Sequence, residues 1–154
     1  MKEQIKLFAL MQIHKSDFQM LHWKTIGDGF DRFHTNITSG YYEKLDKDID
    51  DVAEVLLRQG VNPPNYFEVV MVLNEDGEKV KSISSKKDYR KTEIISYTDM
   101  ILKKILNQII KCLDSDEIKN VKENVGIKSY YEALYNDYDK EYRFLNKRRL
   151  STSI

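Results

Sequence analysis

Two of the three histidines and the only tryptophan of this chain lie in one short stretch. It reads QMLHWKTIGDGFDRFHTNI over residues 19–37 and contains His22, Trp23 and His34. Taken alone, each histidine is more typical of a satisfied core residue or an exposed polar residue than of a metal ligand. Imidazole combined with carboxylate suits iron and other first-row metals, so two histidines that met two acids would form a credible metal site.

Acidic side chains recur at every fourth position further along, in the stretch EKLDKDIDDVAEVLLRQG. Asp46, Asp50 and Glu54 would therefore line one ridge of a helix. One interpretation is a solvated acidic face. The other is a site for a cation or a basic partner, because like charges at this spacing repel each other by about a few tenths of a kcal/mol. The pattern permits a metal site without requiring one.

The histidines and the acids cannot meet within one chain. His34 and Asp50 are 16 residues apart on one predicted helix, which separates them by about 24 Å at the α-helical rise. Two chains paired antiparallel about a twofold axis would bring the histidine end of one beside the acidic end of the other, twice over. The alternative of an intrasubunit di-iron bundle with Glu-x-x-His motifs is excluded, because the sequence contains no such motif.

The spacing of apolar residues predicts four long helices that would position these side chains. Gly60, followed by Pro63 and Pro64, is expected to end the second of them. The first helix is expected from residue 3 to about 25. After a turn at 26–30, the second is expected to run to Gln59. The third is expected over about 93–113 and the fourth from a point after Asp114 to about Arg149, with a division at Gly126 as one option.

The inward faces of these helices share apolar side chains at helical spacing. They are Leu7, Met11, Phe18 and Leu21, on a stripe with His14 and His22; Phe30, Phe33, Ile37, Tyr41, Leu45, Ile49, Val52 and Leu56; Ile94, Ile101, Ile105, Ile109 and Cys112; and Ile127, Tyr131, Leu134, Tyr138 and Leu145. Cys112 is therefore interpreted as a small buried hydrophobe. Residues 61–91 are less regular and are compatible with a hairpin turning at 74–77 or with a short helix and loops.

Four amphipathic helices with one long connection between the second and third predict an all-α, ferritin-like four-helix bundle. A length of 154 residues suits a single domain over residues 1–154. Lys plus Arg (25) balances Asp plus Glu (25), so no overall charge attracts nucleic acid. One cysteine forms no internal disulfide, and neither a membrane span nor a signal peptide is evident, so we expect a cytoplasmic protein.

The residues singled out above resemble those of the Dps family, the mini-ferritins named as DNA-binding proteins from starved cells. The family pattern is His-Trp, a short turn with Gly and Phe, a second His, and Asp-x-x-x-Glu before a Gly. In this chain the pattern is His22-Trp23, residues 27–30, His34, and residues 50–54 ahead of Gly60. The resemblance is strongest over residues 18–60 and weaker at 136–145.

The resemblance implies that His22 and His34 of one subunit and Asp50 and Glu54 of its twofold mate bind iron. The implied protein is a ferroxidase that oxidises Fe(II) with peroxide or oxygen and stores ferric iron in a hollow shell of twelve subunits, protecting against oxidative damage. Trp23, beside His22, would pass an electron and quench radicals, or would simply pack.

The chain also departs from the family pattern. The family usually places the second His fifteen residues before the Asp, whereas here the separation is 16. An irregular turn near Gly40 would restore the phase by about 100°. Val55 stands where the family commonly has Arg, and the segment 61–91 is longer than expected.

Two alternative functions remain open at this point. A shell that mainly coats DNA would depend on the basic tail NKRRLSTSI, with Lys147, Arg148 and Arg149 repeated in each subunit. A bundle that kept the fold without the metal would be a structural or interaction protein, and the extra residue between His34 and Asp50 is the feature that favours it.

Overall fold

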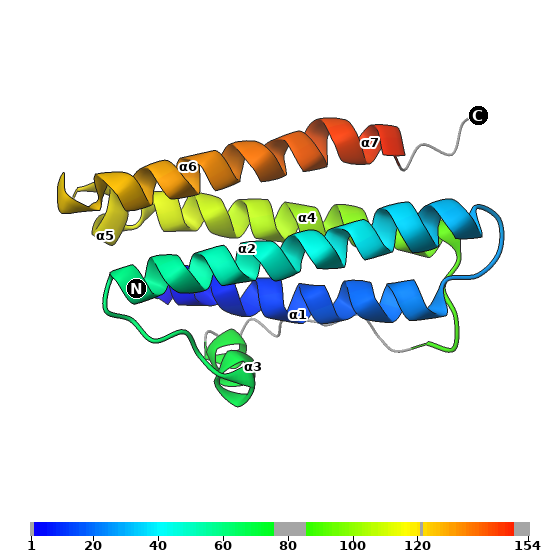
Figure 1. Ribbon diagram of the computed structural model, residues 1–154, viewed down its shortest axis with the longest axis horizontal. Helices are drawn as coiled ribbons and strands as arrows, with labels where there is room; N and C mark the ends of the chain where they lie inside the picture. The colour runs from blue at the N-terminus through cyan, green and yellow to red at the C-terminus, as the bar shows by residue number, and fades with distance from the viewer. Residues whose placement is uncertain (1, 76–85, 121, 150–154) are drawn as a thin grey trace.

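Four long helices lie side by side in an elongated bundle (Figure 1). The computed structural model describes residues 2–75, 86–120 and 122–149. The long helices are α1 (Lys2–Lys24), α2 (Ser39–Arg58), α4 (Lys91–Asp114) and α6 (Val125–Lys140). The predicted all-α four-helix bundle is confirmed. None of the described helices combines the length and the apolar character that a membrane crossing requires.

α1 and α2 run antiparallel, and polar contacts join them at both ends. At one end Gln59 Nε2 donates to Gln4 Oε1 at 2.8 Å. At the other end His22 and His34 are in contact. This pairing fixes which residues of the two helices share a layer, and it puts the histidine-bearing turn at the end of the bundle opposite the C-terminus of α2 (Figure 1).

The predicted inward faces form the core, with one error. The positions expected to face inward are buried, apart from Phe30 and the half-buried His22. The side chain of Leu145 is not among those that the structure describes. Phe30 is 43% exposed, so its placement on the inner face was wrong. Cys112 is fully buried, and burial raises the pKa of its thiol, as expected of a structural hydrophobe rather than a nucleophile.

The turn after α1 is held against the segment that precedes α4. Tyr89 N–H donates to the Lys24 carbonyl at 2.8 Å, and Ile26 N–H donates to the Tyr89 carbonyl at 3.0 Å. Gly27 and Gly29 have positive φ values of 88° and 78°, which residues other than glycine rarely adopt. The start of this turn is therefore held by two backbone hydrogen bonds to Tyr89.

The connection between α2 and α4 contains a short helix, α3 (Tyr66–Asn74), which lies against α1 (Figure 1). Asn65 begins it with a capping box, because its side chain accepts from Glu68 N–H while the Glu68 side chain accepts from Asn65 N–H. Of the two alternatives for residues 61–91, the short helix is correct for the described part. The proposed hairpin turn at 74–77 reaches residues outside it.

The last predicted helix is divided more than expected. It consists of α5 (Asp116–Lys119), a 3-10 turn η2 (Lys122–Asn124), α6, a π-helical turn η3 (Glu141–Leu145) and α7 (Asn146–Arg149). The optional division at Gly126 into a short and a long piece is confirmed to within one residue, because the long piece, α6, begins at Val125. Asn124 Nδ2 donates to the Glu117 carbonyl at 2.7 Å and holds the fold between the two pieces.

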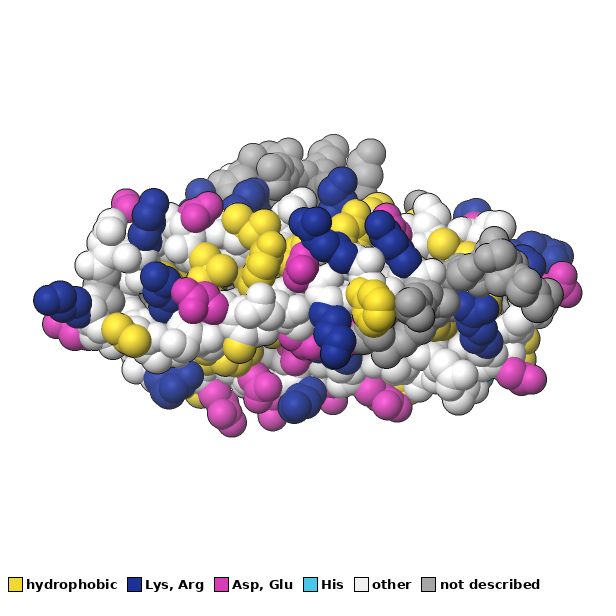
Figure 2. Space-filling view, turned by 90° about the horizontal axis from the view of Figure 1, so that it is seen from above, with side chains coloured by type: hydrophobic (Ala, Val, Ile, Leu, Met, Phe, Trp, Pro, Cys, Tyr) yellow, Lys and Arg dark blue, Asp and Glu magenta, His cyan; other side chains and the backbone are white. Residues whose placement is uncertain are grey.

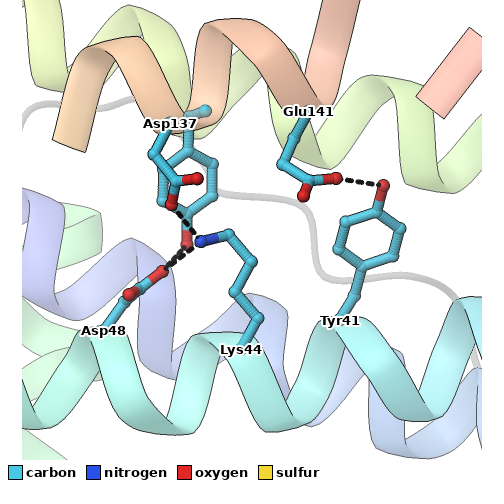
Figure 3. A network of polar contacts seen from close by, with 6 residues as sticks. Tyr41, Lys44, Asp48, Asp137 and Glu141 are labelled. Carbon is cyan, nitrogen blue, oxygen red and sulfur yellow. Dashed lines mark hydrogen bonds and ion pairs between the residues drawn. The ribbon is translucent and has the colours of Figure 1, made fainter. Parts of the chain in front are cut away.

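A network of charged and hydroxyl groups joins α2 to α6 and η3 (Figure 3). Lys44 Nζ contacts the carboxylates of Asp48 and Asp137, and Tyr138 O–H donates to Asp48 Oδ2 at 2.6 Å. Tyr41 O–H donates to Glu141 Oε2 at 3.0 Å. Burial alone would lower the pKa of Lys44, but the two carboxylates outweigh it, and the pKa is raised.

Replacing Lys44 by methionine is expected to destabilise the bundle by about 1–2 kcal/mol, because Asp48 then keeps a partly buried charge with one donor fewer. The raised pKa of Lys44 means that this stabilisation is present below the ordinary value of 10.5 and is lost as the pH rises through the folded-state pKa. Urea unfolding at pH 7.5 and at higher pH, at one protein concentration, would measure it.

The matched control is Lys128→Met, which removes an exposed pair with Glu132 on α6. Its effect should stay within about 0.5 kcal/mol. Equal unfolding midpoints for the two variants would contradict a stabilising role of the Lys44 network.

Candidate metal centre

His22 and His34 lie face to face at the turn between α1 and α2. Their ring centroids are 3.9 Å apart and their planes are inclined by 16°. His22 Nδ1 lies 2.8 Å from the backbone carbonyl oxygen of His34, and His34 Nδ1 lies 2.9 Å from that of His22. Each histidine thus binds the backbone of the other, and the structure brings together the two residues that the sequence singled out.

These reciprocal contacts determine which nitrogen of each ring is free. A carbonyl oxygen can only accept a hydrogen bond, so Nδ1 must carry the hydrogen in both rings. In the neutral imidazole the lone pair is then on Nε2. Metal-binding histidines are commonly oriented in this way, by an N–H donated to a carbonyl. In each ring, Nε2 is therefore the nitrogen that these backbone contacts do not occupy.

A π-helical turn, η1 (Arg32–Thr38), carries His34. At its end Ser39 N–H donates to the His34 carbonyl, five residues earlier rather than the four of an α-helix. The wider turn accommodates one additional residue. The irregular turn expected near Gly40 is confirmed just before that residue, and His34 faces His22 despite the separation of 16 residues from Asp50.

Two aromatic side chains pack on the histidine pair. Phe30 stacks on His34 with centroids 4.8 Å apart and planes inclined by 16°. Tyr42 meets His22 edge-on at 5.4 Å. Neither residue was predicted from the sequence to belong to the site. The available signal was the four-residue spacing of Phe30, His34 and Thr38, which places all three on one side of the turn.

The three acids of the α2 ridge have different surroundings. Asp46 forms an ion pair with Lys15 of α1. Asp50 and Glu54 are exposed one turn apart, and within the described residues neither has a hydrogen-bond or ion-pair partner. The two acids that the resemblance assigns to the site are thus the two without a countercharge.

Within a single chain the acids and the histidine pair occupy different parts of the bundle. Across residues 2–75, 86–120 and 122–149, no group of three or more His, Cys, Asp or Glu side chains is placed to hold a metal ion. One chain presents two nitrogen donors at one end and two carboxylates in the second half of α2. Neither set alone is a complete site.

Apolar side chains are exposed beside each half. Trp23, next to His22, is 72% exposed, so it does not pack in the core of its own chain. Ile26 and Phe30 lie on the same turn. Leu57, three residues after Glu54 on α2, is exposed near the acids. Four further apolar side chains are exposed on α3, which lies against α1: Tyr66, Phe67, Val70 and Met71. Val55 is buried, so nothing at that position replaces the arginine common in the family.

Only the first residues of the basic tail lie in the described part of the chain. Lys147 of α7 is exposed, and the side chains of Arg148 and Arg149 lie outside the description. On the face shown in Figure 2, Lys and Arg side chains are interspersed with Asp and Glu side chains. DNA binding through this tail stays a prediction.

No protein-family model and no curated protein sequence matches this chain. Solved structures do. The chain is similar to Helicobacter cinaedi CAIP at 20% identity, covering 97% of this chain and 99% of that one, with a TM-score of 0.79. It is similar to Staphylococcus aureus Dps at 19% identity, covering 99% and 95%, with a TM-score of 0.78.

A third similar structure is the Dps protein of Vibrio cholerae O1, at 18% identity over 97% of this chain and 87% of that one, with a TM-score of 0.78. That protein is described as a member of a broad superfamily of ferritin-like diiron-carboxylate proteins. At these identities the similarity shows the fold. The predicted ferritin-like bundle is confirmed, and it is the fold of the Dps proteins.

Proposed function

We propose that this chain is a Dps-type mini-ferritin, which binds Fe(II) between two subunits, oxidises it with peroxide or oxygen, and stores the ferric product in a shell. The observation that carries the proposal is the reciprocal pairing of His22 and His34, in which Nδ1 of each ring binds the backbone and Nε2 has no hydrogen-bond partner among the described residues. The similarity in fold to Dps proteins of two other organisms supports it.

The available donors fit ferrous iron. Imidazole nitrogen and carboxylate oxygen are both ligands that first-row divalent metals accept, and fewer than six protein ligands leave positions for an oxidant. His22 and His34 are half-buried, while Asp50 and Glu54 are exposed and can be approached by another subunit. The two carboxylates together carry the charge that balances one Fe(II).

The proposed partner is a second copy of the same chain, paired antiparallel about a twofold axis. Such a pair places the His22 and His34 side chains of each copy beside Asp50 and Glu54 of the other. Exposed apolar residues beside each half, among them Trp23 and Leu57, are the kind of surface that protein interfaces cover. Six such pairs would make the shell of twelve that the resemblance implies.

The proposed reaction transfers electrons from iron to the oxidant. Two Fe(II) ions each lose one electron, and one molecule of peroxide takes up both and leaves as two hydroxide ions. The carboxylates of Asp50 and Glu54 stabilise the higher positive charge of the ferric ion, while the imidazoles of His22 and His34 fix the position of the metal. Trp23, one residue from His22, is proposed to donate an electron to any radical formed by a single-electron side reaction.

The test is Fe(II) oxidation by the unmodified chain. The protein is loaded with Fe(II) without oxygen, peroxide is added, and ferric absorbance is followed beside the same iron in protein-free buffer. We expect oxidation at least about 10-fold faster than in buffer, with the ferric iron eluting together with a large assembly in size-exclusion chromatography. Oxidation at the buffer rate would refute the proposed function.

A further inference from the structure

The backbone carbonyl oxygen of His34 accepts hydrogen bonds from several directions. His22 Nδ1 lies 2.8 Å away, Thr38 Oγ1 lies 3.0 Å away, and Ser39 N–H donates to it along the helix. In a regular α-helix the backbone donor would be the N–H of Thr38. The π turn shifts that donor by one residue. Because the same carbonyl oxygen binds both Ser39 N–H and His22 Nδ1, a change from a π turn to an α-helical turn would also change the orientation of the His22 ring.

Thr38 is the side chain that spans the π turn. It is fully buried, and its hydroxyl lies 2.9 Å from the Phe33 carbonyl and 3.0 Å from the His34 carbonyl. The same hydroxyl lies 3.4 Å from His22 Nδ1. A hydroxyl donates one hydrogen at a time, so it can stabilise either carbonyl while remaining in contact with the ring of His22.

We propose that Thr38 is a positioning residue of the iron site. Its hydroxyl holds the π turn in the form that directs the His34 carbonyl to His22 Nδ1, and so keeps the Nε2 atoms of both imidazoles available to the metal. This inference rests on the proposed function for its consequence in iron binding. The arrangement of the two imidazoles does not depend on that function.

The physical reason is the cost of losing the hydroxyl in a buried place. Without the hydroxyl, the one hydrogen that it donates to either the Phe33 or the His34 carbonyl is lost, and the π turn loses that stabilising interaction. A return of the turn to α-helical register would rotate His34 by about 100° relative to α2. The reciprocal contact with His22 would then break, and Nδ1 would no longer be fixed as the protonated nitrogen.

The decisive comparison is between Thr38→Val, which keeps the shape but removes the hydroxyl, and Thr38→Ser, which keeps the hydroxyl. Thr35→Val is the matched control, because Thr35 is exposed on the same turn and has no hydrogen bond within the described residues. Anaerobic titration calorimetry with Fe(II) should show about 10- to 100-fold weaker binding for Thr38→Val. Thr38→Ser and Thr35→Val should bind Fe(II) as the unmodified chain does.

A second measurement needs no iron. Magic-angle-spinning NMR of the sedimented protein, with nitrogen-15 in its histidines, distinguishes protonated from bare imidazole nitrogens. For His22 and His34 we expect Nδ1 protonated and Nε2 bare in the unmodified chain and in Thr38→Ser. Thr38→Val should show a mixture of both forms.

The outcomes separate the two proposals. If the unmodified chain does not bind Fe(II), the proposed function fails, while the NMR comparison still tests the role of Thr38. If Thr38→Val matches the unmodified chain in Fe(II) affinity and in nitrogen-15 spectrum, the positioning role is refuted. Should Thr38→Val not assemble, the same comparison is made between Thr38→Ala and Thr38→Ser, which differ only by the hydroxyl, and equal affinities and spectra would again refute it.

Discussion

Peroxide-driven oxidation of Fe(II) is expected to fall to the rate in protein-free buffer when Asp50 and Glu54 are both replaced by alanine. These two carboxylates have no partner within the described residues of their own chain, so their proposed role is toward a metal ion held with another subunit. Removing outer partners of metal ligands already costs about 10- to 100-fold, so the loss of two ligands should cost about 100-fold or more. Stopped-flow ferric absorbance measures it.

The control for this variant is Asp46→Ala, one turn earlier on the same ridge. Asp46 is occupied by Lys15, so its removal should leave the oxidation rate within about 2-fold while changing the charge of α2. An equal loss in both variants would mean that only the negative charge of the ridge matters. Full activity in the Asp50→Ala, Glu54→Ala chain would remove these acids from the site.

Mixing two inactive chains is expected to restore oxidation, which is the second large effect. One chain carries His22→Ala and His34→Ala, and the other carries Asp50→Ala and Glu54→Ala. In a mixed twofold pair, one of the two sites receives both sets of substitutions, and the other receives intact histidines from one chain and intact acids from the other. With random pairing half of the pairs are mixed, so about a quarter of the normal activity should return.

The experiment requires assemblies that contain both chains. Both are therefore produced in one cell with different affinity tags, and assemblies that carry both tags are purified. Two tagged copies of the histidine-substituted chain serve as the control and should remain inactive. A mixed assembly no more active than its inactive parents would show that the proposed site is not shared between subunits.

Helical periodicity was sufficient to predict the four-helix bundle, because burial of an apolar stripe is what fixes a long helix in place. The error at Phe30 has a definite cause. The inner face was extended through residues 30–38 at 3.6 residues per turn, whereas residues 32–38 form a π turn with more residues per turn. Phe30 is therefore rotated out of the core, and it stacks on His34 instead.

The candidate site could be predicted only in outline. Residue types and spacing were enough to single out His22, His34, Asp50 and Glu54, and the family resemblance gave them roles that the structure leaves to experiment. The extra residue indicated an irregular turn near Gly40, and the structure has a π turn just before that residue, over residues 32–38. The contacts of Thr38 follow from that turn, so they could not be foreseen.

The short helix α3 is a case in which a local signal was present in the sequence. Asn65 and Glu68, three residues apart before an apolar run, form the capping box observed at its start. That signal favoured the helix over the hairpin at the same residues. In the last helix, the glycine at position 126 indicated the division, but it did not indicate the contact between Asn124 and the carbonyl of Glu117.

The distance along α2 between the histidine end and the acidic end has a consequence for when the proposed chemistry can occur. A newly made or dissociated subunit would hold only half of each site and would leave dissolved Fe(II) unoxidised. The rate per subunit would then depend on protein concentration and collapse on dilution below the dissociation constant of the twofold pair. Ferric product would consequently form only where two subunits are already paired, and not at single subunits in solution.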